Sequence, residues 1–313
     1  MIVSRDGEGS QPVQAHSRQK ECEGTLMVKD RDGGKKHARR ESPKGHMSSS
    51  RVAGRHVARH LFDCWPQVVH SIRSARRLAL FLDFDGTLAA LRTRPSDVRP
   101  LDLPLREVLR SLVRPKRLTL YVISGRTLAE LRQLVPVRGI RLLGLHGWEG
   151  RDVPPLDEER RLLQRAGQLL EQRLSNTPEI RLEDKGLGLA VHYRGASLPA
   201  VRLARALVWE LLRALKPQIH MVRGHKVWEL LPRQIRGKGA AVSALLASLP
   251  RPTLPIFVGD DATDESAFRA LPRGLTIRVG KHPRTAARFR LQSPDEVKMF
   301  LLKLKAAILP GGF

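Results

Sequence analysis

The chain has 313 residues, 41% of them apolar and 28% charged, so it can bury a large core and is neither a peptide nor a disulfide scaffold. No apolar run reaches the roughly 18 residues that a membrane-spanning helix needs. The first residues show no secretory signal, which predicts a cytoplasmic protein without a membrane partner. The two cysteines, Cys22 and Cys64, are too few for a disulfide framework or a cysteine-based zinc site.

The formal net charge of +25 is the one feature of composition that suggests a partner. Lysine and arginine attract phosphate-bearing molecules over long distances. Here they are spread along the chain, and aromatic residues make up only 4% of it, which leaves few platforms for stacking nucleic-acid bases. The composition therefore favours a small anionic substrate over nucleic acid.

The first 55 residues are polar, basic and without a sustained hydrophobic period. Such a segment cannot bury enough apolar surface to offset the entropy of ordering, so we expect residues 1–55 to be disordered. From Val52 to Ile72 apolar residues recur at helical spacing, which predicts one leading helix within residues 56–75.

Strand-like and helix-like segments then alternate, which is typical of a parallel sheet covered by helices on both faces. The expected elements are strand Leu78–Leu82, helix Leu103–Leu112, strand Leu118–Ile123, helix Leu128–Val135 and, late in the chain, helix Ala240–Leu249, strand Pro255–Val258, helix Asp264–Leu271, strand Leu275–Val279 and helix Asp295–Ile308. In such α/β folds ligands bind beyond the carboxyl ends of the strands.

The middle of the chain has a different pattern, with strands that follow each other directly. We expect helix Glu158–Leu174, strands Ile180–Glu183 and Leu187–Tyr193, helix Pro199–Leu215, and strands near His220 and at Val227–Leu231. Adjacent strands joined by short turns pair antiparallel. This stretch of about 80 residues therefore predicts an α+β insertion over the end of the main sheet.

Two carboxylates follow the first predicted strand, in the run Asp83-Phe84-Asp85-Gly86-Thr87. Because strand side chains alternate, Asp83 and Asp85 point to the same side. Carboxylates that close raise each other's pKa unless a cation neutralises them, which suggests a divalent metal ion. An Asp-x-Asp pair also occurs in turns and in metal-dependent glycosyl transfer, but its position at the end of an apolar strand favours a metal site.

Two later segments add a hydroxyl and an ammonium group. Ser124 follows strand Leu118–Ile123 and precedes a capping-box sequence that begins a helix. Lys238 lies between two glycines before an Ala/Leu-rich helix, where backbone N–H groups already favour an anion. Each residue alone is more typical of a turn or an exposed loop.

The last acidic group follows strand Pro255–Val258. Asp260 ends the strand and Asp264 lies in the first turn of the next helix, a spacing that lets two carboxylates converge on one cation. A helix-capping role explains Asp264 but not Asp260. Four strand ends thus present Asp/Asp, Ser, Lys and Asp/Asp, a combination that predicts phosphoryl transfer.

In this combination the sequence resembles the haloacid dehalogenase-like (HAD) phosphatases, whose four motifs match Asp83-Phe84-Asp85-Gly86-Thr87, Ser124, Lys238 and Gly259-Asp260-Asp261. The 114 residues from Ser124 to Lys238 far exceed the roughly 30 of a βαβ unit and leave room for an inserted cap. The resemblance implies a Rossmann-like parallel-sheet core at 76–152 and 233–313 with an α+β cap at 153–232.

Further signatures narrow the resemblance to the trehalose-6-phosphate phosphatases over about residues 76–305. They are Leu145-His146-Gly147-Trp148-Glu149, Glu183-Asp184-Lys185-Gly186 with His192-Tyr193-Arg194, Gly224-His225-Lys226-Val227-Trp228-Glu229, and Gly259 to Glu265. The chain departs from the family pattern at His225 and at Leu231, where the family has Lys and Arg. This departure concerns one cap contact to the sugar, for which Lys226 could supply the charge.

The resemblance implies a role for each matching residue. Mg²⁺ would be held by Asp83, by Asp260 and by the backbone carbonyl of Asp85, with Asp264 behind these ligands. Asp83 would be the nucleophile, Asp85 the acid and base, and Ser124 and Lys238 would balance phosphoryl charge. The substrate-binding residues would be Arg126, His146, Glu149, Lys185, His225, Lys226 and Glu229.

These observations leave three functions open. The first is hydrolysis of trehalose 6-phosphate, with the phosphorylated disaccharide as substrate and a trehalose-6-phosphate synthase as the partner that the resemblance suggests. A related HAD phosphatase for sucrose phosphate or mannosylglycerate phosphate would keep the four motifs and change the cap. A non-catalytic nucleic-acid-binding protein would use the charge alone, and the intact Asp83, Asp85, Lys238 and Asp260 argue against it.

Overall fold

The computed structural model describes residues 58–92, 97–224, 226–281 and 284–309. All of these belong to one compact unit that begins at Gly54. The expected disordered segment 1–55 and the site candidate His225 lie outside the described residues.

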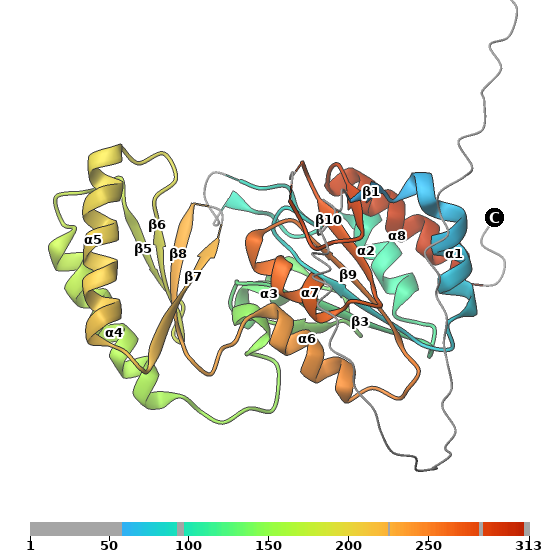
Figure 1. Ribbon diagram of the computed structural model, residues 1–313, viewed down its shortest axis with the longest axis horizontal. Helices are drawn as coiled ribbons and strands as arrows, with labels where there is room; N and C mark the ends of the chain where they lie inside the picture. The colour runs from blue at the N-terminus through green and yellow to red at the C-terminus, as the bar shows by residue number, and fades with distance from the viewer. Residues whose placement is uncertain (1–57, 93–96, 225, 282–283, 310–313) are drawn as a thin grey trace, which may run out of the picture. The chain divides into compact units, whose positions relative to one another are not determined.

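A parallel sheet of seven strands forms the centre of the larger part of this unit (Figure 1). Its strands, in the order β1-β11-β10-β9-β2-β3-β4, are β1 (Arg59–His60), β11 (Phe289–Leu291), β10 (Leu275–Val279), β9 (Leu254–Gly259), β2 (Leu78–Leu82), β3 (Leu118–Ile123) and β4 (Arg141–Leu143). The five residues of β2 are all buried, which explains why this strand is a continuous apolar run.

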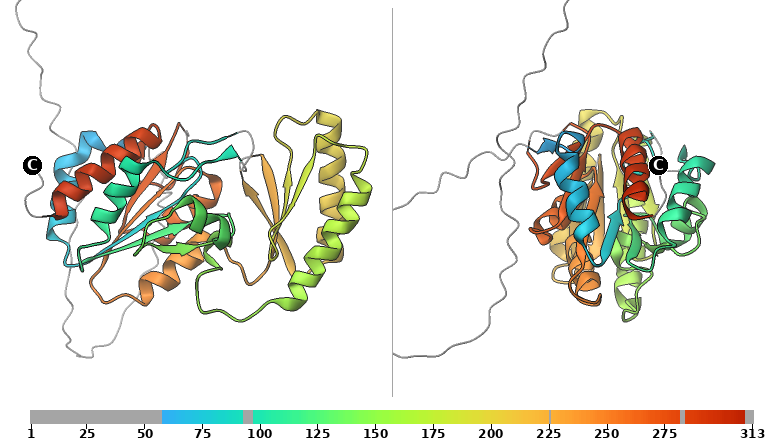
Figure 2. Two further views of the ribbon diagram at one scale, coloured as in Figure 1. Left: turned by 180° about the vertical axis from the view of Figure 1, so that it is seen from behind. Right: turned by 90° about the vertical axis from the view of Figure 1, so that its right-hand side faces the viewer.

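Helices cover both faces of this sheet, as Figures 1 and 2 show. They are α1 (Trp65–Ser74), α2 (Leu103–Leu112), α3 (Leu128–Leu134), α6 (Lys238–Ala247), α7 (Glu265–Ala270) and α8 (Pro294–Ile308). The apolar sides of α1, α2, α3 and α8 form one buried cluster with the sheet, and those of α6 and α7 form a second cluster on the opposite face. This confirms the expected α/β class.

The segment before β2 differs from the prediction of a single leading helix over residues 56–75. Arg59 and His60 form the short edge strand β1, which pairs in parallel with β11. A 3₁₀ turn at Phe62–Cys64 follows, and α1 begins only at Trp65, with Pro66 in its first turn. The helical spacing of the apolar residues was misleading, because Leu61, directly after β1, and Cys64, in the 3₁₀ turn, are buried without being part of the helix.

The inserted segment forms a separate antiparallel sheet in the order β5-β6-β8-β7. Its elements are α4 (Asp157–Arg173), β5 (Arg181–Asp184), β6 (Leu189–His192), α5 (Leu198–Ala214), β7 (Ile219–Gly224) and β8 (Val227–Pro232). The two helices pack on one face of the sheet around their own buried cluster. We call this segment the cap and the seven-stranded part the core.

The alternation of side chains along the cap strands separates its two faces. Leu182, Val191 and Trp228 pack against the helices, and Trp228 also stacks on Tyr193 with 4.3 Å between ring centroids. Polar residues occur among the intervening positions, and of these Glu183 and Glu229 line a cavity that the cap shares with the core. Among the described residues, no helix is long and apolar enough to cross a membrane.

Candidate active site

Three carboxylates meet at the carboxyl ends of the two central strands. Asp83 follows β2 and Asp260 follows β9. These two strands pair in parallel, and the Asp83 N–H extends the pairing by donating to the Val258 carbonyl at 2.9 Å. Asp264 lies in the 3₁₀ turn after β9. One oxygen from each carboxylate lies within 4.8 Å of the others, which is a spacing that one cation can bridge.

Lys238 closes this cluster from the first position of α6. Its Nζ donates to Asp83 Oδ1 at 2.6 Å and to Asp264 Oδ1 at 2.7 Å. The helix can lie this close to α7 because residue 239 is glycine, since a Cβ there would meet the Ser266 carbonyl at 2.5 Å. The sequence separation of Asp83 and Lys238 hid this contact, but the predicted convergence of the strand ends is present.

The carboxylates carry more negative charge than Lys238 balances. Burial, together with the neighbouring Asp264 and Asp85, raises the pKa of Asp83 to about 7, although Lys238 opposes the shift. Burial and the charges of Asp83 and Asp264 raise the pKa of Asp260 to about 9. Burial alone would lower the pKa of Lys238, but Asp264 and Asp83 raise it. With all three carboxylates ionised, the site is therefore short of two positive charges, the charge of one divalent cation.

Three local features of this cluster suit a metal ion that would supply the missing charge. Asp260 Oδ1 is buried and has no hydrogen-bond partner among the described residues, so a donor or a cation is missing from its surroundings. Gly86 lies against the same carboxylate, because a Cβ there would be 2.1 Å from Asp260 Oδ2. Asp264 is fixed from behind, with Oδ2 accepting from the Asp261 N–H at 2.9 Å. Oxygen-only ligands of this kind suit Mg²⁺.

Ser124, Arg126 and Asp85 form the next part of the wall. Ser124 Oγ accepts from the Arg126 N–H at 3.2 Å and is buried beside the acidic cluster. The Arg126 guanidinium donates to both oxygens of Asp85 at 2.7 Å and lies over the Phe84 ring. Burial would lower the pKa of Arg126, but this pairing with Asp85 raises it. Arg126, predicted as a substrate-binding residue, here orients Asp85.

On the cap side, Glu229 joins the two parts of the molecule. Its Oε1 accepts from Lys185 Nζ at 2.6 Å, and its Oε2 lies 2.6 Å from His146 Nε2 in the core. Lys185 also donates to the Gly125 carbonyl of the core at 2.9 Å. Burial would raise the pKa of Glu229, but Lys185 and His146 hold it far below its usual range. We call Lys185, Glu229 and His146 the cap latch.

A second pair on the cap was missed as a candidate. His192 Nε2 lies 2.7 Å from Glu183 Oε2, and both residues line the same cavity beside Arg181. Burial would raise the pKa of Glu183, but the hydrogen bond from His192 and the charge of Lys185 lower it. The signal was available in the sequence, since Glu183, His192 and Glu229 alternate with the apolar residues that face the cap helices.

These groups surround one cavity of about 530 Å³. Of the predicted site residues, it is lined by Asp83, Asp85, Ser124, Arg126, His146, Lys185, Glu229, Lys238 and Asp260. Asp264 lies buried directly behind Asp83 and Lys238. The cavity therefore has an acidic floor in the core and paired charges in the cap.

Two predicted substrate-binding residues lie elsewhere. Glu149 does not line the cavity, because its Oε2 accepts from the Leu128 N–H at 2.5 Å and holds the start of α3. Lys226 is exposed at the turn between β7 and β8 and is not part of the cavity wall. Leu231 is fully buried with Leu145 and Ile235, so the leucine that replaces the family's arginine contributes to apolar packing here.

A parallel α/β core with Asp83, Ser124 and Asp260 at adjacent strand ends and Lys238 at the start of α6, beneath an inserted cap, holds the kinds of group that phosphoryl transfer through a carboxylate needs. The comparisons with known proteins make this specific. The trehalose-phosphatase family model matches residues 81–295, and the chain belongs to this family.

Its relatives agree with this placement. A trehalose-phosphate phosphatase of Mycobacterium tuberculosis is 36% identical over 252 residues, covering 74% of this chain and 62% of the relative. An uncharacterized glycosyl hydrolase of the same species has the same identity, and the match covers 18% of it. The chain thus spans less than two thirds of either relative.

Among solved structures, the C-terminal domain of Candida albicans trehalose-6-phosphate phosphatase superposes with a TM-score of 0.68 over 80% of this chain and 98% of that domain. At 21% identity this likeness concerns the fold. It confirms the expected arrangement of a parallel core sheet with a separate antiparallel sheet.

Proposed function

We propose that this protein is a Mg²⁺-dependent phosphatase that hydrolyses trehalose 6-phosphate to trehalose and phosphate. The observation that carries the proposal is one cavity with two chemically different walls. Its floor holds Asp83, Asp260 and Lys238, and its cap side holds Lys185 and Glu229. A phosphate ester of a polyhydroxylated sugar has a matching division between a dianion and neutral hydroxyl groups.

The metal would be held by Asp83, Asp260 and the backbone carbonyl of Asp85, with Asp264 behind them. The buried, unpartnered Asp260 Oδ1 and the raised pKa values of Asp83 and Asp260 support this role. When bound, Mg²⁺ supplies Lewis-acid neutralisation of the phosphoryl oxygens.

The hydrolysis has two steps. In the first, a carboxylate oxygen of Asp83 attacks phosphorus and the bond from phosphorus to the sugar oxygen breaks. Asp85, which carries a proton at the start of the cycle in place of one of its two hydrogen bonds from Arg126, gives that proton to the sugar oxygen. In the second, Asp85 takes a proton from water, the oxygen of this water attacks phosphorus, and the bond to Asp83 breaks. The enzyme returns to its starting state, and inorganic phosphate leaves.

Ser124 and Lys238 would balance the charge on the transferred group. Lys238 is buried and held by two carboxylates, so its ammonium group is fixed before the substrate arrives. A fixed charge in a site that excludes water stabilises developing negative charge without reorganisation. Ser124 offers a hydroxyl from the adjacent strand end.

The cap residues would recognise the sugar. Lys185, Glu229 and His146 are buried and already paired, so a sugar must exchange hydrogen bonds with them rather than simply fill a gap. A site that leaves buried polar groups unpaired with the wrong ligand rejects that ligand strongly. This supports selectivity for one sugar phosphate.

Phosphate release from a panel of sugar phosphates, with and without Mg²⁺, tests the proposal. We expect trehalose 6-phosphate to be the preferred substrate and chelation of Mg²⁺ to abolish turnover. Preference for sucrose phosphate or mannosylglycerate phosphate would instead indicate the related sugar phosphatases, whose cap differs. Absence of phosphate release from every ester would contradict the assignment. A cytoplasmic location and a trehalose-6-phosphate synthase as partner belong to the same proposal.

A further inference from the structure

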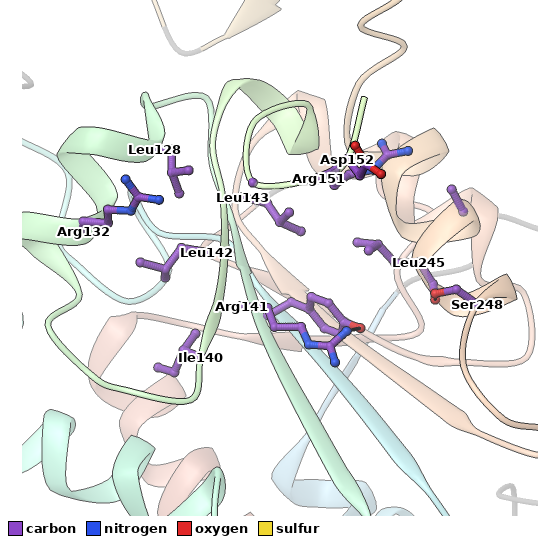
Figure 3. A pocket seen from close by; sticks show the side chains of 13 residues that line it. Leu128, Arg132, Ile140, Arg141, Leu142, Leu143, Arg151, Asp152, Leu245 and Ser248 are labelled. Carbon is purple, nitrogen blue, oxygen red and sulfur yellow. Dashed lines mark hydrogen bonds between the residues drawn. The ribbon is translucent and has the colours of Figure 1, made fainter. Parts of the chain in front are cut away.

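A second cavity, of about 750 Å³, lies at the edge of the core sheet beside β4. It runs from α3 across the edge strand to α6 and shares no lining residue with the candidate active site. Its floor is apolar, formed by Leu128, Ile140, Leu142, Leu143 and Leu245 (Figure 3). Within the part of the chain that the structure describes, strand β4 has a neighbouring strand only on its β3 side.

Three arginines stand around this floor on different sides, as Figure 3 shows. Arg141 donates to the Tyr121 hydroxyl at 3.2 Å, and Arg151 donates to the Gly147 carbonyl at 3.2 Å, so both have neutral partners. Arg132 is exposed on α3. Asp152 is the single carboxylate in the lining, and no ion pair joins it to these arginines within the described residues. Elsewhere, by contrast, Arg126 and Arg278 pair with carboxylates.

We propose that this cavity, which we call the β4 groove, binds an extended acidic segment of another protein that also carries apolar side chains. The apolar floor and the separated guanidinium groups match such a segment at several points. Arginine beside a partly apolar patch is typical of protein interfaces, where a few anchors carry most of the affinity. Because the guanidinium groups do not converge, a single small anion would satisfy only one of them.

Charge argues against the other occupants. Residues 1–57 of this chain hold twelve Lys and Arg against seven Asp and Glu, so they do not complement the groove. A second copy would bring the same arginines and a net charge of +25. Nucleic acid would find no stacking platform, because the one aromatic side chain in the lining, Tyr121, is fully buried.

The groove also touches the supports of the candidate active site. Helix α3 begins three residues after Gly125, and α6 begins at Lys238 itself. An occupant of the groove would therefore contact both α3 and α6, the helices that begin close to Gly125 and at Lys238. The binding site is nevertheless separate, so it can be tested without disturbing phosphate release.

The test uses the full chain and an immobilised array of peptides in which Asp and Glu alternate with Leu, Ile, Val or Phe. Matched arrays replace the acids by Lys or the apolar residues by Ser. We expect the acidic, apolar peptides alone to bind, with affinity lowered at least about 10-fold by the pair Arg132→Glu and Arg141→Glu. Ala244→Trp, which fills the groove without changing charge, should have a similar effect.

The control pair is Arg202→Glu and Arg205→Glu on the exposed side of α5, which should leave binding unchanged. All variants should keep the basal phosphate release, which shows that they fold. Equal binding by wild type and groove variants, or absence of binding to every acidic peptide, would overturn the proposal. So would groove-dependent binding of oligo-thymidylate in preference to the peptides, or groove-dependent dimerisation measured by light scattering.

Discussion

The two walls of the candidate active site treat charge in opposite ways. In the core, Asp83, Asp260 and Asp264 share one ammonium group, and the pKa values of Asp83 and Asp260 are raised to about 7 and about 9. In the cap latch, Glu229 has two partners, and its pKa lies far below the usual range. The core is incomplete without a cation, whereas both oxygens of the Glu229 carboxylate in the cap latch already have a partner.

This difference separates the chemistry from the recognition. An excess of buried carboxylates is costly unless a cation binds, so the core is suited to hold a divalent cation. Paired groups at the cap hold it against the core, because Lys185 and Glu229 contact Gly125 and His146 across the cavity. In the proposed function, the groups that hold the cap against the core would have to release each other when the sugar binds.

The largest effect should come from Asp83→Asn, which removes the proposed nucleophile with almost no change in volume. We expect phosphate release to fall by about 10⁴-fold or more, in the range found when a nucleophile is removed. Thermal unfolding should change little, because Lys238 keeps Asp264 as a partner. The control is Asp295→Asn at an exposed position of α8. Turnover within 10-fold of the wild type would contradict the core assignment.

The next effect concerns the cap latch. Glu229→Gln leaves the Lys185 ammonium group buried without its carboxylate, which we expect to lower the free energy of unfolding by about 3 kcal/mol. The kcat/KM for trehalose 6-phosphate should fall by about 100-fold, as hydrogen bonds to the sugar are lost. Steady-state kinetics and urea denaturation measure the two quantities.

A matched control for the latch is Glu183→Gln, which breaks the pair with His192 within the cap. It removes a charge from the same cavity without touching the core. We expect a smaller loss of stability, because this pair is more exposed than the latch. Equal effects of Glu183→Gln and Glu229→Gln on stability would show that the contact between cap and core stabilises the protein no more than a pair within the cap.

The sequence predicted the central strands of the seven-stranded sheet more completely than the strands near its edges. Strands with uninterrupted apolar runs, such as Leu78–Leu82, were found because both faces are buried. Strand β4 contains Arg141, and β11 contains Arg290, so neither shows the apolar run of a buried strand. Such short strands at or next to the edge of the sheet owe their conformation to the neighbouring strands, a dependence that no local sequence pattern shows.

The site divides in a similar way. Asp83, Ser124 and Asp260 follow from strand ends, because parallel strands bring their carboxyl ends together. Lys238 reaches the same point from the first position of α6 instead. The partners of the side chains could not be predicted, since they depend on tertiary geometry. Arg126 turned toward Asp85, and Glu149 turned toward the start of α3. Both were predicted to contact substrate on the basis of motif position alone.

The contact between Arg126 and Asp85 gives a third prediction. Arg126→Lys keeps the charge but loses the two-point grip that orients Asp85. We expect turnover of trehalose 6-phosphate to fall by about 10-fold, because its alkoxide leaving group needs a proton from Asp85. Formation of the aspartyl-phosphate from p-nitrophenyl phosphate, whose leaving group needs no proton, should change by less than about 3-fold. Rapid-mixing measurement of p-nitrophenol release in the first turnover makes the comparison, and equal losses would contradict the orienting role.

The smallest effect links metal to pH through the same core carboxylates. In the metal-free protein Asp83 and Asp260 keep protons up to about pH 7 and about pH 9, whereas unfolded aspartate loses them near 3.8. The folded state therefore binds more protons than the unfolded state across this range, so these groups lower stability as pH rises. The proposed Mg²⁺ would bind the ionised carboxylates and offset this loss. The increase in melting temperature on adding Mg²⁺ should be larger by several degrees at pH 9 than at pH 6. Asp260→Asn should abolish most of that difference, and an increase that is the same at both pH values would show that the core carboxylates are ionised without the metal.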